Sequence, residues 1–213
     1  MKVALLAGGT GLIGSQLLQL LVDSMRYDKI KCLSRGGLPV DHQKIELIKT
    51  DGGNLNELSP LIKADDVFCC LGTTIKKAKT ETAFRKVDFE YPLHLANLAK
   101  ASGASQFLLV SSLGADSSSS VFYNRVKGEV EEAIDAVRFE SYHIFRPSLL
   151  LGQRSEERSG EDAAKIFFKL FGFLVPGKYK AIDSAKVARA ILANALKEEK
   201  GKFIHESKTL QSY

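Results

Sequence analysis

Three glycines near the start of the chain have a spacing that suits phosphate binding. Gly8, Gly11 and Gly14 follow a short apolar run at residues 3–7, which predicts a buried β-strand. Residues 12–22 then predict a helix with an apolar face. A strand, a glycine turn and a helix bring backbone N–H groups and a helix N-terminus against a pyrophosphate. This context favours dinucleotide binding over an ordinary glycine-rich turn.

Each glycine of this turn has its own expected task. Gly8 permits the tight turn, Gly11 lets the backbone approach the phosphates, and Gly14 allows close packing of the helix on the strand. The residues predicted to bind the cofactor here are Gly8, Thr10, Gly11, Leu12, Ile13 and Gly14.

The end of the second predicted strand, residues 29–34, indicates which cofactor binds. An acidic residue there would bond the adenosine ribose of NAD and repel a 2′-phosphate. The chain instead has Ser34 and Arg35, and an arginine forms charge-assisted hydrogen bonds with a phosphate. We therefore favour NADP, with NAD less favoured; the alternative is that Arg35 is a solvated loop residue.

Polar residues also follow the next three predicted strands. Asp51, just past the strand at 45–49, suits a bond to the adenine amino group or a turn before the next glycines, and both remain open. Leu71, Gly72 and Thr73 end the strand at 66–71, where a glycine lets the backbone approach the ribose and pyrophosphate. Ser111 and Ser112 end the strand at 106–110.

The strands and helices alternate along the chain. A sixth strand is expected at 141–146 and a last short one at 201–205, with helices at 80–102, 122–137 and 183–196 and a break near Pro92. This order predicts an α/β fold of the Rossmann type, a doubly wound parallel sheet between two layers of helices. Ligands of such sheets bind at the carboxyl ends of the strands, where the polar residues lie.

Composition limits the other classes of protein. At 213 residues the chain suits a single domain, with residues from about 147 to 213 forming a small, helical, substrate-side lobe that includes an amphipathic helix at 162–171. The net charge of +5 is scattered, which argues against nucleic-acid binding. No apolar run reaches transmembrane length.

The cysteines indicate a reducing compartment. Cys32, Cys69 and Cys70 all fall in predicted strands, which is typical of reduced core thiols in a cytoplasmic protein. The chain enters its first strand at once, so we expect no signal or transit peptide.

The helix at 122–137 carries a polar pair beside its core face. Tyr123 and Lys127 are four residues apart, so their side chains lie on the same side of the helix, at an edge that faces a cleft. The acidic run at 129–132 is expected on the solvated face. His143 is expected to be a core residue of its strand.

Together these segments carry a resemblance to a known family. Ser111-Ser112 followed by Tyr123-Asn-Arg-Val-Lys127 resembles the Ser/Tyr-x-x-x-Lys constellation of the short-chain dehydrogenases/reductases. The segments at 70–74, 87–88, 111–116 with 123–129, and 146–151 are similar to an atypical branch of that superfamily, the Tat-interacting oxidoreductase group. The likeness spans nearly the whole chain.

The resemblance implies roles for individual residues. Tyr123 would donate a proton to a substrate carbonyl, and Lys127 would lower the pKa of that phenol and hold the nicotinamide ribose. Ser112 would hydrogen-bond the carbonyl, with Ser111 as the alternative. Arg146 and Pro147 would complete the cofactor site.

The chain also departs from the family pattern. Most short-chain enzymes have an asparagine in the helix after the fourth strand, where this chain has Val87-Asp88, so a four-residue proton relay is in doubt. Only 67 residues follow Arg146, which argues against a bulky nucleotide-sugar substrate.

Three functions are therefore considered. The first is an NADP-dependent oxidoreductase that acts on a small carbonyl or alcohol. The second is a cofactor-binding regulator or assembly protein that senses NADPH and contacts a protein partner. The third and weakest is a nucleoside-diphosphate-sugar epimerase or dehydratase. A homo-oligomer is compatible with each of them, and a metal site is expected in none.

Overall fold

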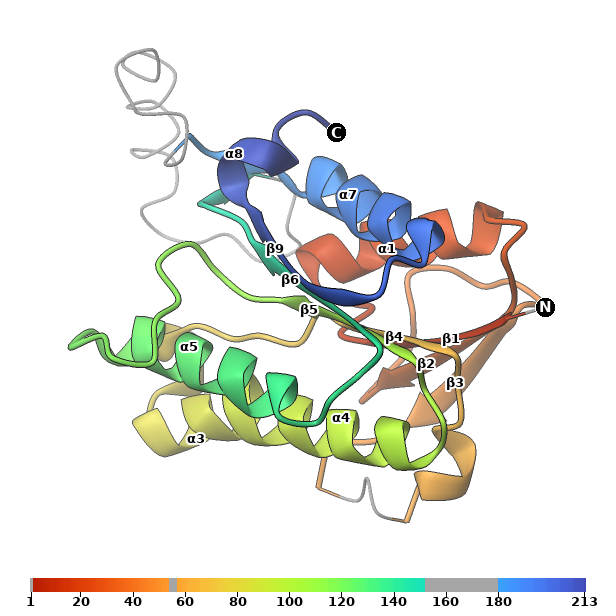
Figure 1. Ribbon diagram of the computed structural model, residues 1–213. Helices are drawn as coiled ribbons and strands as arrows, with labels where there is room; N and C mark the ends of the chain where they lie inside the picture. Colours follow the sequence, from red (N-terminus) through yellow and green to blue (C-terminus); the bar gives the residue numbers. More distant parts are fainter. Residues whose placement is uncertain (1, 54–56, 152–179) are drawn as a thin grey trace.

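A parallel seven-stranded sheet forms the centre of the computed structural model, which describes residues 2–53, 57–151 and 180–213 (Figure 1). Every neighbouring pair of strands runs parallel. The strands, in their order across the sheet, are β3 (Ile45–Lys49), β2 (Tyr27–Ser34), β1 (Lys2–Ala7), β4 (Asp66–Cys69), β5 (Gln106–Val110), β6 (Ser141–Arg146) and β9 (Gly201–Glu206).

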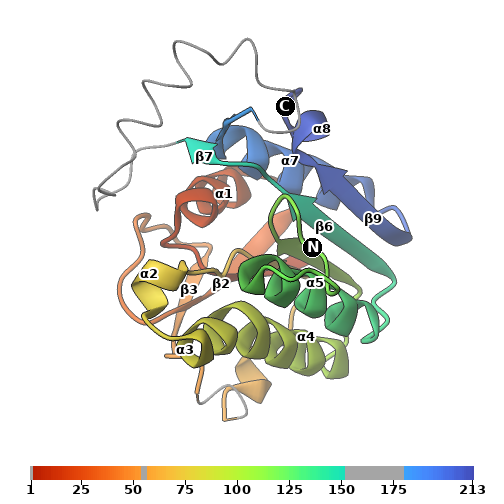
Figure 2. The same ribbon diagram turned by 90° about the vertical axis from the view of Figure 1, so that its left-hand side faces the viewer.

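Helices cover both faces of the sheet and make three layers (Figures 1 and 2). One face carries α1 (Leu12–Asp23) and α7 (Ser184–Lys197). The other carries α3 (Glu81–Arg85), the π-helical segment η2 (Lys86–Glu90), α4 (Tyr91–Ala101) and α5 (Phe122–Asp135). The shorter elements are the 3₁₀ turn η1 (Ser59–Leu61), α2 (Ile75–Ala78), β7 (Leu150–Leu151), β8 (Ile182–Asp183) and α8 (Ser207–Leu210).

The alternation of side chains along the strands gives the molecule two cores. In β5, Leu108 packs with the α1 and α7 side, while Phe107 and Leu109 pack with the α4 and α5 side. All three are at most 1% exposed. Such strands are buried on both faces, which explains why they read as continuous apolar runs.

The strand order reverses beside β1, and this places the ligand crevice. The chain passes from β1 to β2 and β3 on one side, then returns to β4 on the other side of β1. The carboxyl ends of β1 and β4 therefore flank a topological switch point, where ligands of such sheets bind. Gly8 immediately follows β1 at this point.

The doubly wound fold predicted from the sequence is confirmed, with two adjustments. The expected helix at 80–102 is divided into α3, η2 and α4, and Pro92 occupies the first turn of α4. The short strand expected at 201–205 is β9, the parallel edge strand beside β6.

Residues 180–213, the described C-terminal part of the expected substrate-side lobe at 147–213, contribute elements to the main body. β9 belongs to the sheet, and α7 packs on α1. β7 and β8 pair as a separate two-stranded sheet. The amphipathic helix predicted at 162–171 lies outside the described residues. Within the described part of the chain, every helix is too short or too polar to cross a membrane.

His143 lies in the core, as expected, and joins a chain of polar groups across three strands. It is 0% exposed, and its Nε2 lies 3.0 Å from the hydroxyl of Ser141, which also accepts a hydrogen bond from Gln106. Its Nδ1 lies 3.0 Å from Nε2 of His205. Burial, helped by His205 and by Lys197 of α7, lowers the pKa of His143 to about 4.

We predict that this histidine makes stability depend on pH. The unfolded chain binds a proton at His143 near pH 6.5, whereas the folded chain leaves the ring neutral down to about pH 4. Stability is therefore full above pH 6.5 and falls below it, by about 2 kcal/mol at pH 5 for this one group. Urea unfolding at pH 7 and pH 5 measures the loss.

His143→Phe should remove most of that pH dependence. His42→Asn, in the loop before β3, is the control and should keep the wild-type dependence. An equal loss of stability between pH 7 and 5 in the wild type and in His143→Phe would contradict the assignment.

Candidate functional site

The glycine turn after β1 brings three segments into backbone contact. Gly8 has a φ of +86°, and a Cβ added to it would lie 2.5 Å from the carbonyl oxygen of Cys70, at the end of β4. A Cβ on Gly14 would lie 2.1 Å from the carbonyl oxygen of Gly8. Both distances are too short for any side chain, so this packing of β1, α1 and the end of β4 requires glycine at both positions.

The N-terminus of α1 is left open by this turn. Gly11 is its N-cap residue, no side chain caps it, and its first turn contains no acidic residue. Thr10 and Gly11 are exposed, Leu12 is half-buried, and Ile13 and Gly14 are buried. The uncapped N–H groups and the helix dipole therefore suit a pyrophosphate, so the residues fit the dinucleotide expected here.

Polar residues at the ends of β2 and β3 lie on the same edge of the sheet. The backbone N–H of Thr50 donates to the carbonyl of Ser34 over 2.9 Å, which ties the two strand ends together. Arg35 is exposed and makes no ion pair or hydrogen bond with any residue that the structure describes. Asp51 accepts a hydrogen bond from Gly53 N–H over 2.7 Å, as in the turn that was one of its two predicted roles.

Lys127 of α5 is buried against a carboxylate. Its Nζ lies 2.7 Å from Oδ1 of Asp88, and the two side chains are 5% and 0% exposed. The other carboxylate oxygen of Asp88 accepts a hydrogen bond from the backbone N–H of Thr73 over 2.8 Å. The pair thus joins α5, η2 and the end of β4.

The charge state of Lys127 follows from this environment. Burial lowers the pKa of the ammonium, but the carboxylate of Asp88 and the phenol of Tyr123 outweigh burial and leave the pKa raised above its ordinary value. Lys127 is therefore a cation at neutral pH. A Cβ on Gly72 would lie 3.7 Å from its Nζ, so the ammonium reaches the end of β4, where the cofactor is expected.

The π-helical turn explains how Asp88 reaches Lys127. Asp88 lies within η2, where the extra residue per turn changes which side chains face inward. Asp88 is 1% exposed, between α3 and α4. The sequence placed Val87-Asp88 near the position of the family asparagine but did not predict the ion pair, because helical periodicity does not reveal a π-turn.

Among the residues that the structure describes, none bonds the hydroxyl groups of Ser112 and Tyr123. Ser112 Oγ is buried and has no hydrogen-bond partner among the described residues. Tyr123 is half-buried, and its ring packs on Phe84 at a centroid distance of 5.5 Å. Its hydroxyl makes no hydrogen bond within the described part of the chain. By contrast, Ser111 donates its hydroxyl to Glu131.

The burial of Glu131 corrects the expectation that residues 129–132 form a solvated face. Glu131 is 3% exposed, and its Oε2 lies 2.5 Å from Nη2 of Arg146. Arg146 also pairs with Glu206 at 3.2 Å, and its neighbour Pro147 accepts a hydrogen bond from Leu113 N–H. Glu131 was missed because three of the four residues at 129–132 are acidic, which is typical of an exposed surface.

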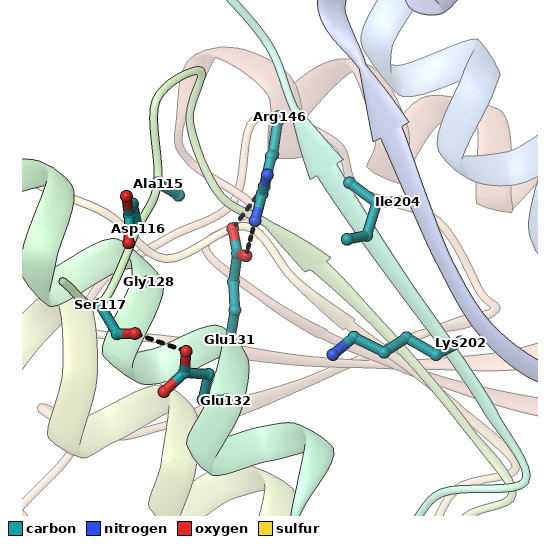
Figure 3. Close-up of a pocket in the computed structure, with 9 residues that line it drawn as sticks. All are labelled: Ala115, Asp116, Ser117, Gly128, Glu131, Glu132, Arg146, Lys202 and Ile204. Atoms are coloured by element: carbon teal, nitrogen blue, oxygen red, sulfur yellow. Dashed lines mark hydrogen bonds and ion pairs between the residues drawn. The ribbon is translucent and has the colours of Figure 1, made fainter. Parts of the chain in front are cut away.

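A cavity lies beside the Glu131–Arg146 ion pair (Figure 3). Its volume is about 370 Å³, and its lining includes Arg146 and Glu131 but not Ser112, Tyr123 or Lys127. The lining charges are of both signs, and Lys202 in its wall pairs with Asp135. The cavity is therefore separate from the crevice beside β1.

The predicted site residues whose contacts are described above fall into two groups. The glycine turn, Leu71 to Thr73 and the Lys127–Asp88 pair lie around the carboxyl ends of β1 and β4. Arg146 and Pro147 instead lie at the end of β6, where the Glu131 ion pair and the bond to Leu113 hold them. Thr73 and Gly72 connect the glycine turn to Lys127.

The fold and the crevice define a Rossmann-type dinucleotide-binding architecture, and the sequence identifies the family. The pattern of the "NAD dependent epimerase/dehydratase family" matches residues 4–200. The chain belongs to this family.

Two proteins of known sequence are similar to this chain over most of its length. "Protein HTATIP2" of Rattus norvegicus is 36% identical over 204 residues, which cover 94% of this chain and 84% of the rat protein. "Protein FMP52, mitochondrial" of Meyerozyma guilliermondii is 35% identical over 201 residues, which cover 91% of this chain and 85% of the fungal protein. The resemblance to the Tat-interacting oxidoreductase group is confirmed.

Solved structures share the fold at low sequence identity. UDP-glucose 4-epimerase from Thermotoga maritima, solved with UDP-glucose, superposes with a TM-score of 0.72 at 16% identity. The match covers 94% of this chain and 75% of that one. The Bordetella bronchiseptica enzyme WbmH, solved in complex with NAD⁺, gives a TM-score of 0.73 at 18% identity and covers 96% and 75% of the two chains.

The glycine turn yields a direct prediction. Gly14→Ala forces a methyl group against the carbonyl of Gly8, so we expect the free energy of unfolding to fall by about 1–3 kcal/mol and binding of a nicotinamide cofactor to weaken at least roughly tenfold. Urea unfolding and nicotinamide fluorescence measure the two effects.

Gly37→Ala adds the same methyl group where nothing lies within 4 Å, and it should change neither quantity. The prediction is wrong if Gly14→Ala unfolds and binds the nicotinamide cofactor as the wild type does.

Proposed function

We propose that the protein is an NADPH-dependent oxidoreductase of the atypical short-chain type, which interconverts a small carbonyl compound and its alcohol. The observation that carries the proposal is the buried hydroxyl group of Ser112, which has no partner among the described residues, together with Tyr123 at the side of a lysine that is buried and charged. A protein that only binds a cofactor has no need of a buried, unpaired hydroxyl group, whose desolvation is costly unless a ligand bonds it.

The roles of the residues follow from their chemistry. The nicotinamide cofactor supplies the hydride when it is bound. Ser112 donates a hydrogen bond to the carbonyl oxygen of the substrate and holds it next to the phenol of Tyr123. Tyr123 gives its proton to that oxygen as negative charge develops there, and it accepts the proton in the reverse direction.

Lys127 holds the ribose and stabilises charge on Tyr123. Its ammonium has three N–H donors. Asp88 pairs with the ammonium from one side, so N–H donors remain for the ribose hydroxyls and the phenol oxygen. Asp88 also fixes the backbone of Thr73, so the same carboxylate sets the lysine and one wall of the cofactor crevice. In this chain Asp88 takes the place of the family asparagine, as an anionic support of the lysine.

The preference for NADPH rests on the end of β2. The acidic residue that would select NAD is absent from this position, and Arg35 has no partner among the described residues, so its guanidinium is available to a 2′-phosphate. The cofactor site would comprise the glycine turn, Ser34, Arg35, Asp51, residues 71–73, Tyr123 and Lys127, with Arg146 and Pro147 at its margin.

Two alternatives keep specific support. A regulatory protein that senses NADPH and contacts a protein partner would need the cofactor crevice but not the proton donor. A nucleotide-sugar epimerase is suggested by the similar fold of UDP-glucose 4-epimerase from Thermotoga maritima, but this chain spans only 75% of that enzyme. A cytoplasmic location stays a prediction, and the name of the fungal relative places that protein in mitochondria.

Replacing the proton donor separates enzyme from sensor. Tyr123→Phe removes only the phenol oxygen, so NADPH binding should stay within about twofold of wild type, while kcat falls by about 10²–10⁴-fold. The assay follows NADPH oxidation with benzaldehyde, cyclohexanone and menadione. Tyr213→Phe, near the C-terminus, is the matched control and should retain full activity.

The outcomes of this assay are distinct. If Tyr123→Phe matches the wild type on an accepted carbonyl, Tyr123 is not the acid. If the wild type binds NADPH but turns over none of the carbonyls, the sensor function is favoured instead.

Arg35 sets the expected cofactor preference. Arg35→Ala should raise the Kd for NADPH by about 10–100-fold, the loss expected for a charge-assisted hydrogen bond, and should change the Kd for NADH by less than about twofold. Titrations that follow nicotinamide fluorescence measure both constants. Arg138→Ala, the control, removes an equal charge beyond the end of α5 and should change neither Kd. Equal effects of Arg35→Ala on the Kd values for NADPH and NADH would exclude the 2′-phosphate role.

A further inference from the structure

We propose that Glu131 is a positioning residue for the reaction: its carboxylate locks helix α5 to the ends of β5 and β6 and so fixes Ser112 relative to Tyr123. We call the group Ser111, Glu131, Arg146 and Glu206 the strand-end clamp. This inference rests on the proposed oxidoreductase function and adds to it a residue that touches neither substrate nor cofactor.

Glu131 is the centre of the clamp. Its Oε1 accepts hydrogen bonds from the hydroxyl of Ser111 and, over 3.1 Å, from Nε of Arg146. Its Oε2 accepts from Nη2 of Arg146, so the guanidinium grips the carboxylate at two points (Figure 3). Glu206 of β9 holds the remaining arm of Arg146 at 3.2 Å. The clamp therefore spans α5, β5, β6 and β9.

The clamp acts on Ser112 through the two residues that flank it. The backbone N–H of Ser111 donates to the carbonyl of Phe145 over 2.8 Å, and that of Leu113 donates to Pro147 over 2.9 Å. Phe145 and Pro147 are in turn the neighbours of Arg146. Ser112 is thus suspended between two backbone bonds to the segment that Glu131 holds.

The same helix face carries the rest of the machinery. Tyr123, Lys127 and Glu131 follow one another at four-residue intervals, so they form one stripe along α5. Lys127 pairs with Asp88 and Glu131 with Arg146, so α5 supplies the cation of one ion pair and, one turn further on, the buried anion of the next. The Glu131–Arg146 pair fixes the position of α5, and therefore of Tyr123, relative to Ser112 at the end of β5.

The burial of Glu131 shows that the clamp is costly to disturb. A carboxylate that is 3% exposed is stable only while its hydrogen bonds compensate for lost hydration, and this one has three. Glu131→Gln keeps the shape of the side chain, but its NH2 group cannot accept the bonds of the oxygen it replaces, and the bonds to the remaining oxygen lose the help of the negative charge. A misplacement of about 1 Å between reacting groups can cost about 10²-fold in rate.

The test is a double-mutant cycle in the NADPH assay. Glu131→Gln should lower kcat by about 10–100-fold with KM and the Kd for NADPH within about twofold, because only the Ser112 to Tyr123 geometry changes. In the Ser112→Ala background the same substitution should cost less than about threefold, since the residue it positions is already absent. A merely structural role would cost the same in both backgrounds.

Two further variants test whether the loss of rate comes from the strand-end clamp. Ser111→Ala removes one bond of the clamp and should lower kcat less than Ser112→Ala does, without loss of folding. Glu132→Gln, which alters the exposed neighbour bonded to Ser117, should behave as the wild type.

Each outcome has one meaning. Wild-type kcat in Glu131→Gln, or equal costs of that substitution in both backgrounds, overturns the positioning role and leaves the proposed reaction intact. If the wild type itself turns over no carbonyl, the proposed function and the positioning role fall together.

Discussion

The structure depends on a cation held inside the protein. The ammonium of Lys127 is 5% exposed, and an ammonium in such a place is tolerated only with a compensating charge and hydrogen bonds. Asp88 supplies the charge from 2.7 Å, and the π-turn η2 is the local irregularity that brings it there. Because Asp88 also holds the backbone of Thr73, the ion pair joins α5 to the end of β4. Helix α5 and the carboxyl end of β4 are in this way held together by one ion pair.

A second constraint is that every strand of the main sheet runs in the same direction. The segments after β1, β2, β3, β4, β5 and β6 therefore all emerge at one edge, although they are spread over more than a hundred residues of sequence. Close backbone packing then fixes the centre of that edge, since Gly8 and Gly14 leave no space for a side chain between β1, α1 and Cys70. The site is assembled by topology and needs few direct contacts between its parts.

This explains how much of the site the sequence could predict. The glycine spacing, the apolar strands and the four-residue interval between Tyr123 and Lys127 are local patterns, and each has one structural meaning in this fold. Glu131 and Asp88 had no such pattern. Glu131 lies in an acidic run that looks solvated, and its burial comes from Arg146, which is fifteen residues away on another element. A π-turn follows no apolar periodicity, so the pairing of Asp88 with Lys127 became visible only in three dimensions.

The distribution of hydrogen bonds separates residues that are bonded to one another from two whose hydroxyl groups are not. Ser111 is bonded to Glu131, Lys127 is paired with Asp88, and Arg146 is shared between Glu131 and Glu206. Ser112 and Tyr123 are the members of this neighbourhood whose hydroxyl groups have no partner among the described residues. A buried hydroxyl group without a partner destabilises the fold by about 1–3 kcal/mol, so its retention is best explained by a ligand that bonds it. The charged residues pair with one another, and under the proposed function the hydroxyl groups of Ser112 and Tyr123 would bond the single carbonyl or alcohol oxygen of the substrate.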